Sequence, residues 1–95
     1  MHANLGRLDS ASLFFDKALA GYTAATDKRG QATTCFKIAW VHNVKGEYEQ
    51  GLTTNLRALR LMEELDDQEG IAGALVRVAW ALYKQEKAEE SLKYA

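Results

Sequence analysis

The fold is decided by two stretches forty positions apart: residues 27–46, DKRGQATTCFKIAWVHNVKG, and residues 67–86, DQEGIAGALVRVAWALYKQE. Across the chain, eleven of the 55 residue pairs separated by forty positions are identical. Unrelated sequence of ordinary composition would give roughly three or four. The alignment of the two copies needs no gap. The chain therefore contains a duplicated unit of forty residues, and each copy is called a repeat below.

Each repeat is expected to consist of two helices, because its apolar residues recur at helical spacing. The chain has no proline, so glycines and polar caps mark the helix ends. Gly6 and Gly46 can adopt the left-handed conformation that ends a helix, whereas Glu86 stands at the third such position. Asp66 and Glu69 have the spacing of a capping box at a helix start. We expect helices over 7–25, 28–45, 47–65, 68–85 and 87–95.

Composition excludes several classes of protein. The 95 residues are 47% hydrophobic and carry a net charge of -1, which offers no attraction for nucleic acid or anionic lipid. No apolar run approaches the length of a membrane span, and Met1 does not start a secretory signal. We therefore expect a cytoplasmic protein that binds neither nucleic acid nor membrane.

No catalytic or metal-binding motif is present. The sequence has no phosphate loop, no nucleophile elbow and no Cys/His cluster, so we expect no enzyme activity, no cofactor and no metal. Cys35 lies on an apolar stripe and is expected to be a buried, inert thiol. His2 and His42 have no second ligand residue three or four positions away, and we expect packed or partly exposed neutral histidines there.

The stretch Gly46-Glu47-Tyr48-Glu49-Gln50-Gly51-Leu52, followed by Ala58-Leu59, resembles the second-helix signature of tetratricopeptide repeats. Residues 6–19 match the same signature, with Phe15 at the family's aromatic position and Asn55 standing there in the next repeat. The resemblance implies an all-α fold, a right-handed α-solenoid of stacked antiparallel helix pairs with about five helices. It divides the single domain of residues 1–95 into a partial repeat (1–26), a complete repeat (27–66) and a second partial repeat (67–95).

Members of this family bind a peptide or partner protein in a concave groove lined by the first helix of each pair. By this resemblance, the groove is expected to be lined by Phe36, Trp40, Asn43, Val44, Val76, Trp80, Tyr83 and Lys84. The family often has asparagine where Trp40 and Trp80 stand, so aromatic packing replaces an amide contact.

The helix over 68–85 is apolar on two sides. Ile71, Leu75, Val78 and Leu82 form one stripe, and Val76, Trp80 and Tyr83 form another roughly 135° around the helix. One neighbouring helix cannot cover both stripes. Two arrangements remain open: Trp40 and Trp80 pack between successive first helices, or they also present a face to a partner.

Two functions are consistent with these patterns. The first is a module that binds a protein or peptide segment, as an excised part of a larger regulatory or signalling protein. The alternative is a structural spacer or self-associating segment without a separate ligand. We also expect a homo-oligomer formed through the uncapped terminal helices, because a helical repeat stack without a capping helix leaves an apolar flank open.

Overall fold

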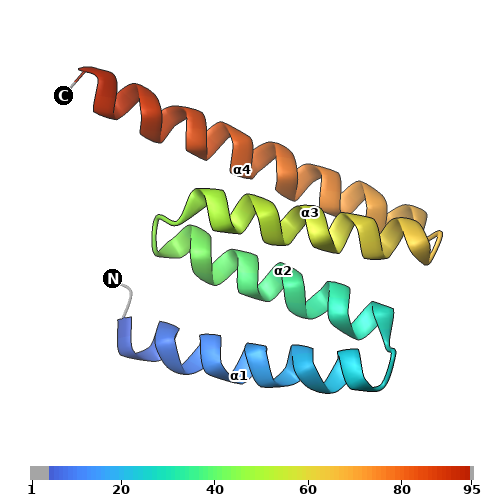
Figure 1. The fold of residues 1–95 in the computed structure, drawn as a ribbon. Helices are drawn as coiled ribbons and strands as arrows, with labels where there is room; N and C mark the ends of the chain where they lie inside the picture. Colours follow the sequence, from blue (N-terminus) through green and yellow to red (C-terminus); the bar gives the residue numbers. More distant parts are fainter. Residues whose placement is uncertain (1–4, 95) are drawn as a thin grey trace.

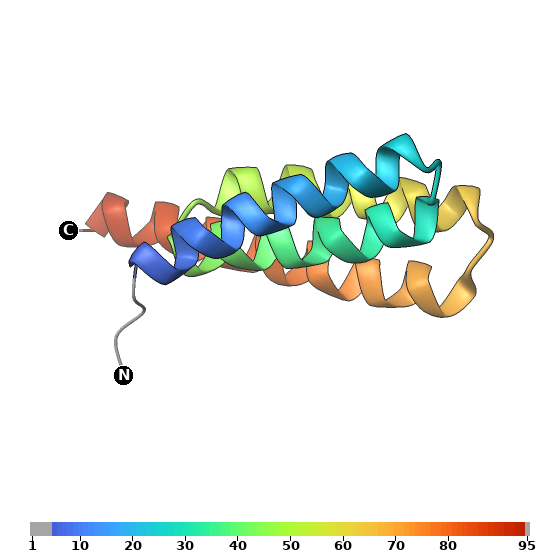
Figure 2. The same cartoon turned by 90° about the horizontal axis from the view of Figure 1, so that it is seen from below.

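Four antiparallel helices make up the fold. A computed structural model describes residues 5–94, which hold α1 (Leu5–Ala24), α2 (Lys28–Val44), α3 (Tyr48–Glu64) and α4 (Gln68–Tyr94) and no strand. The helices form a row in chain order, and each packs mainly against the next one (Figure 1). The α1–α2 and α3–α4 turns lie at the same end of the row. At that end, α1 and α3 lie on one side of the row, and α2 and α4 lie on the other side (Figure 2).

The prediction of an all-helical fold is confirmed, but the separate fifth helix over 87–95 is wrong within the described residues. The last helix runs without a break to Tyr94 and is 27 residues long, against 17 for α2 and for α3. No glycine stands at position 86 to favour a left-handed turn. Lys87 also holds the helix together, because its Nζ lies over the Tyr83 ring and 3.5 Å from the Glu90 carboxylate.

The three turns have the same backbone geometry and recur every twenty residues. Each contains one residue in the left-handed conformation: Thr26 at φ 56°, Gly46 at φ 82° and Asp66 at φ 54°. In each turn, the N–H of the following residue donates to the carbonyl five positions earlier, at 2.8 to 3.1 Å. This bond is the signature of a Schellman motif, which satisfies carbonyls that a helix end leaves bare.

The helix starts are also equivalent in the two repeats. Asp27 accepts a hydrogen bond from the Gly30 N–H, and Asp67 accepts one from the Gly70 N–H, both at 3.0 Å. The Gly70 N–H, followed by the Arg29 side chain, lowers the pKa of the Asp67 carboxyl. The predicted capping box of Asp66 and Glu69 is therefore wrong. Asp67 caps the helix, because Asp66 occupies the left-handed position of the turn.

The prediction that Gly6 ends a helix is wrong, because Gly6 lies within α1. The expected left-handed glycine is found at Gly46 only, among the glycines that the structure describes. Space at Gly46 is open, so its role is conformational rather than steric.

The core is built around α2, which has helices on two sides. It buries Thr34 and Val41 on one face, and Ala32, Cys35 and Ala39 on another. Burial raises the pKa of the Cys35 thiol, as expected for an inert core cysteine. In α4 the corresponding contact with α3 is made by two fully buried alanines, Ala74 and Ala81. These small residues let the two helices approach closely.

The predicted stripe of Ile71, Leu75, Val78 and Leu82 is only partly covered. Leu75 and Leu82 are each 51% exposed. Ile71 and Val78 are half-buried at the edge of the α3 contact. The reason is that the alanine side of α4, rather than its leucine side, faces α3.

Thr26→Gly is expected to raise the free energy of unfolding by about 1 kcal/mol, because a β-branched residue in the left-handed conformation is strained and glycine is not. Urea denaturation monitored by circular dichroism measures the change. Gly46→Ala is the matched control at the equivalent position of the next turn and should lower stability by about the same amount. A Thr26→Gly variant less stable than the parent would contradict this account of the turn.

Candidate functional site

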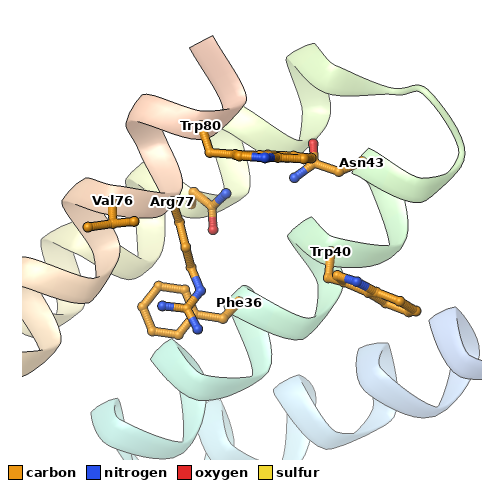
Figure 3. A pocket seen from close by; sticks show the side chains of 7 residues that line it. Phe36, Trp40, Asn43, Val76, Arg77 and Trp80 are labelled. Carbon is orange, nitrogen blue, oxygen red and sulfur yellow. The ribbon is translucent and has the colours of Figure 1, made fainter. Parts of the chain in front are cut away.

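A hollow of about 430 Å³ lies between α2, α3 and α4. Three elements line it: α2 on one side, α4 on the other and α3 at the base. Figure 3 displays the facing side chains of α2 and α4, with Trp80 extending towards Asn43 and Arg77 over Phe36. The lining residues are Phe36, Trp40 and Asn43 of α2, Asn55 of α3, and Val76, Arg77 and Trp80 of α4.

Two amide oxygens in the wall of this hollow have no hydrogen-bond partner among the described residues. These are Oδ1 of Asn43 and Oδ1 of Asn55, and both atoms are buried. The Asn55 side chain is almost completely buried, at 2% exposure. A buried oxygen without a hydrogen-bond partner lowers the free energy of unfolding by about 1 to 3 kcal/mol. These two asparagines therefore destabilise the folded protein. A ligand that donates an N–H would remove the cost.

Gly51 of α3 creates the space that Asn43 occupies. A Cβ atom at position 51 would lie 3.3 Å from the Ala39 carbonyl oxygen and would collide with the Asn43 amide oxygen. Gly51 therefore allows α3 to approach α2 closely. It also brings the Asn43 amide into the wall of the hollow.

Aromatic rings and cationic side chains alternate along the rim. The Arg77 guanidinium lies 4.3 Å from the centroid of the Phe36 ring, and the Lys84 ammonium lies 5.4 Å from that of Trp80. Arg77 also donates to the Gly73 carbonyl at 3.3 Å. These cation–π contacts hold the long side chains over the rings without neutralising their charge. The rim therefore combines apolar surface with positive charge.

A second hollow, of about 260 Å³, continues the first one towards α1. It shares Phe36, Trp40 and Arg77 with the first hollow and adds Phe15 and Lys37. The two hollows are related by the repeat. Four lining residues of the second hollow correspond, forty positions later, to four of the first: Phe15 to Asn55, Phe36 to Val76, Lys37 to Arg77, and Trp40 to Trp80.

The repeat relationship shows how the linings of the two hollows differ. At the base of the second hollow stands a phenylalanine, and its counterpart in the first hollow is the smaller Asn55. The change from Phe15 to Asn55 therefore removes a ring and leaves an amide in its place. The same position therefore holds an aromatic side chain, Phe15, in one repeat and a polar side chain, Asn55, in the other.

Five of the eight predicted groove residues line the first hollow together: Phe36, Trp40, Asn43, Val76 and Trp80. Of the other three, Val44 and Tyr83 are exposed, and Lys84 lies beside the Trp80 ring. None of these three is among the residues that line the hollow. Trp40 and Trp80 are 59% and 45% exposed, so both present much of their surface outside the helix stack.

Four residues that line the two hollows were not predicted as site residues: Asn55, Arg77, Phe15 and Lys37. The Arg77 guanidinium reaches from α4 across to the Phe36 ring of α2. A comparison of the two repeats position by position could have identified Asn55, since it is the polar exception at a position that holds an aromatic residue in the other repeat.

The other candidate residues do not form sites in the described part of the chain. Within residues 5–94 no three His, Cys, Asp or Glu side chains gather as a metal ion would require. The Nδ1 atom of His42 lies 2.9 Å from the Glu47 carboxylate instead. His2 lies outside the described residues. None of the helices in this range has the length and apolar character to pass through a membrane.

Comparison with known proteins gives no family assignment: no protein-family model matches the chain, and no curated protein is significantly similar to it.

Proposed function

We propose that the protein is a tetratricopeptide-like interaction module, a helical-repeat solenoid that binds a peptide segment of a partner protein in the hollow between α2, α3 and α4. The observation that carries the proposal is the unpaired, buried Asn55 oxygen in a hollow walled by aromatic rings. Such an oxygen does not stabilise a core, whereas in a binding site it provides specificity for a ligand that donates a hydrogen bond. The site offers recognition rather than catalysis, and the cytoplasmic setting stays a prediction.

The lining defines the chemistry of the peptide. Trp40, Trp80 and Val76 provide a surface for a large apolar or aromatic side chain, and indoles dominate the energetics of many interfaces. The unpaired Asn55 oxygen is the acceptor for a backbone N–H group of the peptide in this proposal. Arg77 attracts a carboxylate, and no Asp or Glu is among the residues lining the two hollows. We therefore expect an extended segment that contains an aromatic or large aliphatic residue next to an acidic one.

A peptide library displayed on phage and panned on the immobilised protein tests the proposal. The expected result is a recovered set of peptides that share an apolar residue beside Asp or Glu. Synthetic copies of these peptides then provide defined probes, and titration calorimetry measures their affinity for the parent and for variants. The proposal fails if no shared pattern emerges or if the recovered peptides are basic.

Trp80→Ala is expected to weaken binding of a recovered peptide about 30-fold, which corresponds to about 2 kcal/mol, while the far-ultraviolet circular dichroism stays helical. The exposure of Trp80 is the reason that the fold should tolerate the change. Leu13→Ala is the matched control, because Leu13 is an exposed apolar residue on α1 that lines neither hollow. Equal weakening by both variants would contradict binding in the hollow.

Asn55→Leu separates recognition from folding. Leucine has the same branched heavy-atom skeleton as asparagine and no unpaired oxygen, and its larger methyl groups can extend into the hollow, so the variant should be at least as stable as the parent. Peptide affinity should nevertheless fall, because the acceptor is lost. A variant that binds the peptide as tightly as the parent would show that Asn55 makes no contact with it.

A further inference from the structure

One flank of α4 is uncovered where the equivalent flank of α2 is buried. In α2, Ala32, Cys35 and Ala39 are at most 1% exposed. Their counterparts forty positions later, Ala72, Leu75 and Ala79, are all exposed, and so is Leu82. The flank of α4 is also the more apolar of the two, because leucines stand at the positions of Cys35 and His42. The residues Ala72, Leu75, Val78, Ala79 and Leu82 are called the α4 flank below.

The cover of the α2 flank is the helix that follows it, α3. Gly51 of α3 lies against the Ala39 carbonyl and the Asn43 side chain. Glu47, immediately before α3, bonds to His42 of α2. The Arg57 charge acts on the Cys35 thiol from α3 as well. The turn at Gly46 makes this cover possible, because it returns the chain along the helix that has just ended.

The sequence contains the corresponding cover for α4. Residues 87–94 stand forty positions after residues 47–54, the start of the segment that covers α2, and Glu49 and Leu52 recur as Glu89 and Leu92. In this structure, however, residues 87–94 continue α4 beyond the level at which α3 begins (Figure 1). A segment of an unbroken helix cannot fold back onto that same helix.

We propose that residues 87–94 cover the α4 flank of a second copy of this chain. Two α4 helices would lie antiparallel with position 86 of one beside position 86 of the other. Each copy's residues 87–94 would then lie beside Val78 and Leu82 of its partner, in the way that Glu49, Gln50, Thr53 and Thr54 lie beside His42 within one chain. The exchange forms a two-fold symmetric dimer, in which both contacts are the same.

This surface is separate from the peptide hollow. Val76 and Trp80 line the hollow from the opposite side of α4, so a dimer formed through the flank leaves the hollow open. The inference does not depend on the proposed peptide-binding function. Trp80→Ala should accordingly leave the dimer unchanged, which makes failure of the two proposals distinguishable.

Sedimentation velocity over about 5 µM to 1 mM protein tests the proposal. The parent is expected to shift from monomer to dimer with rising concentration. Leu82→Lys should stay monomeric over this range, because it places a charge in the centre of the exchanged contact. The matched control is Leu13→Lys, since Leu13 is 65% exposed on α1, and it should dimerise like the parent. A parent that stays monomeric, or a Leu82→Lys variant that dimerises equally well, overturns the proposal.

Glu86→Gly tests the exchange itself. Glycine at this position recreates the turn found at Gly46, so that residues 87–94 can fold back and cover the flank of their own chain. The dimer should dissociate at a concentration at least about tenfold higher than for the parent. If the Glu86→Gly variant dimerises as tightly as the parent, the proposal that residues 87–94 cover the partner's α4 flank is wrong. Far-ultraviolet circular dichroism of each variant checks folding, and the milder Leu82→Ser decides the result if Leu82→Lys unfolds.

Discussion

Ile38→Ala is expected to lower the free energy of unfolding by about 3 kcal/mol, because the side chain lies in the core of α2 with 9% exposure. Truncation removes buried methyl groups and leaves a cavity that the closely packed helices cannot fill. In a domain of this size the loss corresponds to a decrease in melting temperature of about 15 °C. Urea denaturation monitored by circular dichroism provides the free energy directly.

The repeat supplies the control for this prediction. Val78 occupies the same position in the second repeat but is only half-buried, because no helix covers the α4 flank. Val78→Ala should therefore lower the free energy of unfolding by about 1 kcal/mol or less at low protein concentration. Similar losses in the two variants would mean that the two flanks are equally covered in solution.

Ala32→Leu is expected to lower the free energy of unfolding by about 3 kcal/mol for the opposite reason. Ala32 is fully buried, so a larger side chain must push the neighbouring helix away or adopt a strained rotamer. Ala72→Leu introduces the same residue at the equivalent exposed position of α4 and should change stability by less than about 0.5 kcal/mol. Thermal denaturation of the two variants under identical conditions measures the contrast. A destabilised Ala72→Leu variant would contradict an open flank.

The pattern of turns and helices was largely predictable because its signals are local. Gly46 ends a helix, Asp27 and Asp67 start helices, and apolar spacing defines what lies between them. The continuation of α4 past Glu86 was not predicted. The duplicated pattern favoured a third turn there, while the residues around position 86 lack the glycine that permits it. A repeat indicates equivalent positions, and it does not guarantee equivalent backbone conformations.

The candidate site was predictable in part. The resemblance to tetratricopeptide repeats led to Phe36 and Trp40, and Trp80 was also expected from an apolar stripe of its helix. The base of the hollow was missed, because the contribution of α3 depends on how closely three helices approach one another. Which side chains of a helix reach the hollow also depends on the neighbouring helices. Arg77 of α4 extends to the Phe36 ring of α2, whereas Tyr83 of the same helix does not line the hollow.

The row of helices has a consequence for motion. Since each helix packs mainly against its sequence neighbours, either end of the row can detach while the middle stays folded. Amide hydrogens should therefore exchange with solvent fastest in α1 and in the far end of α4, and slowest where α2 and α3 meet. A peptide seated between α2 and α4 would tether the outer helix to the centre and slow that local opening, so that binding would be detectable as protection of backbone amides far from any contact.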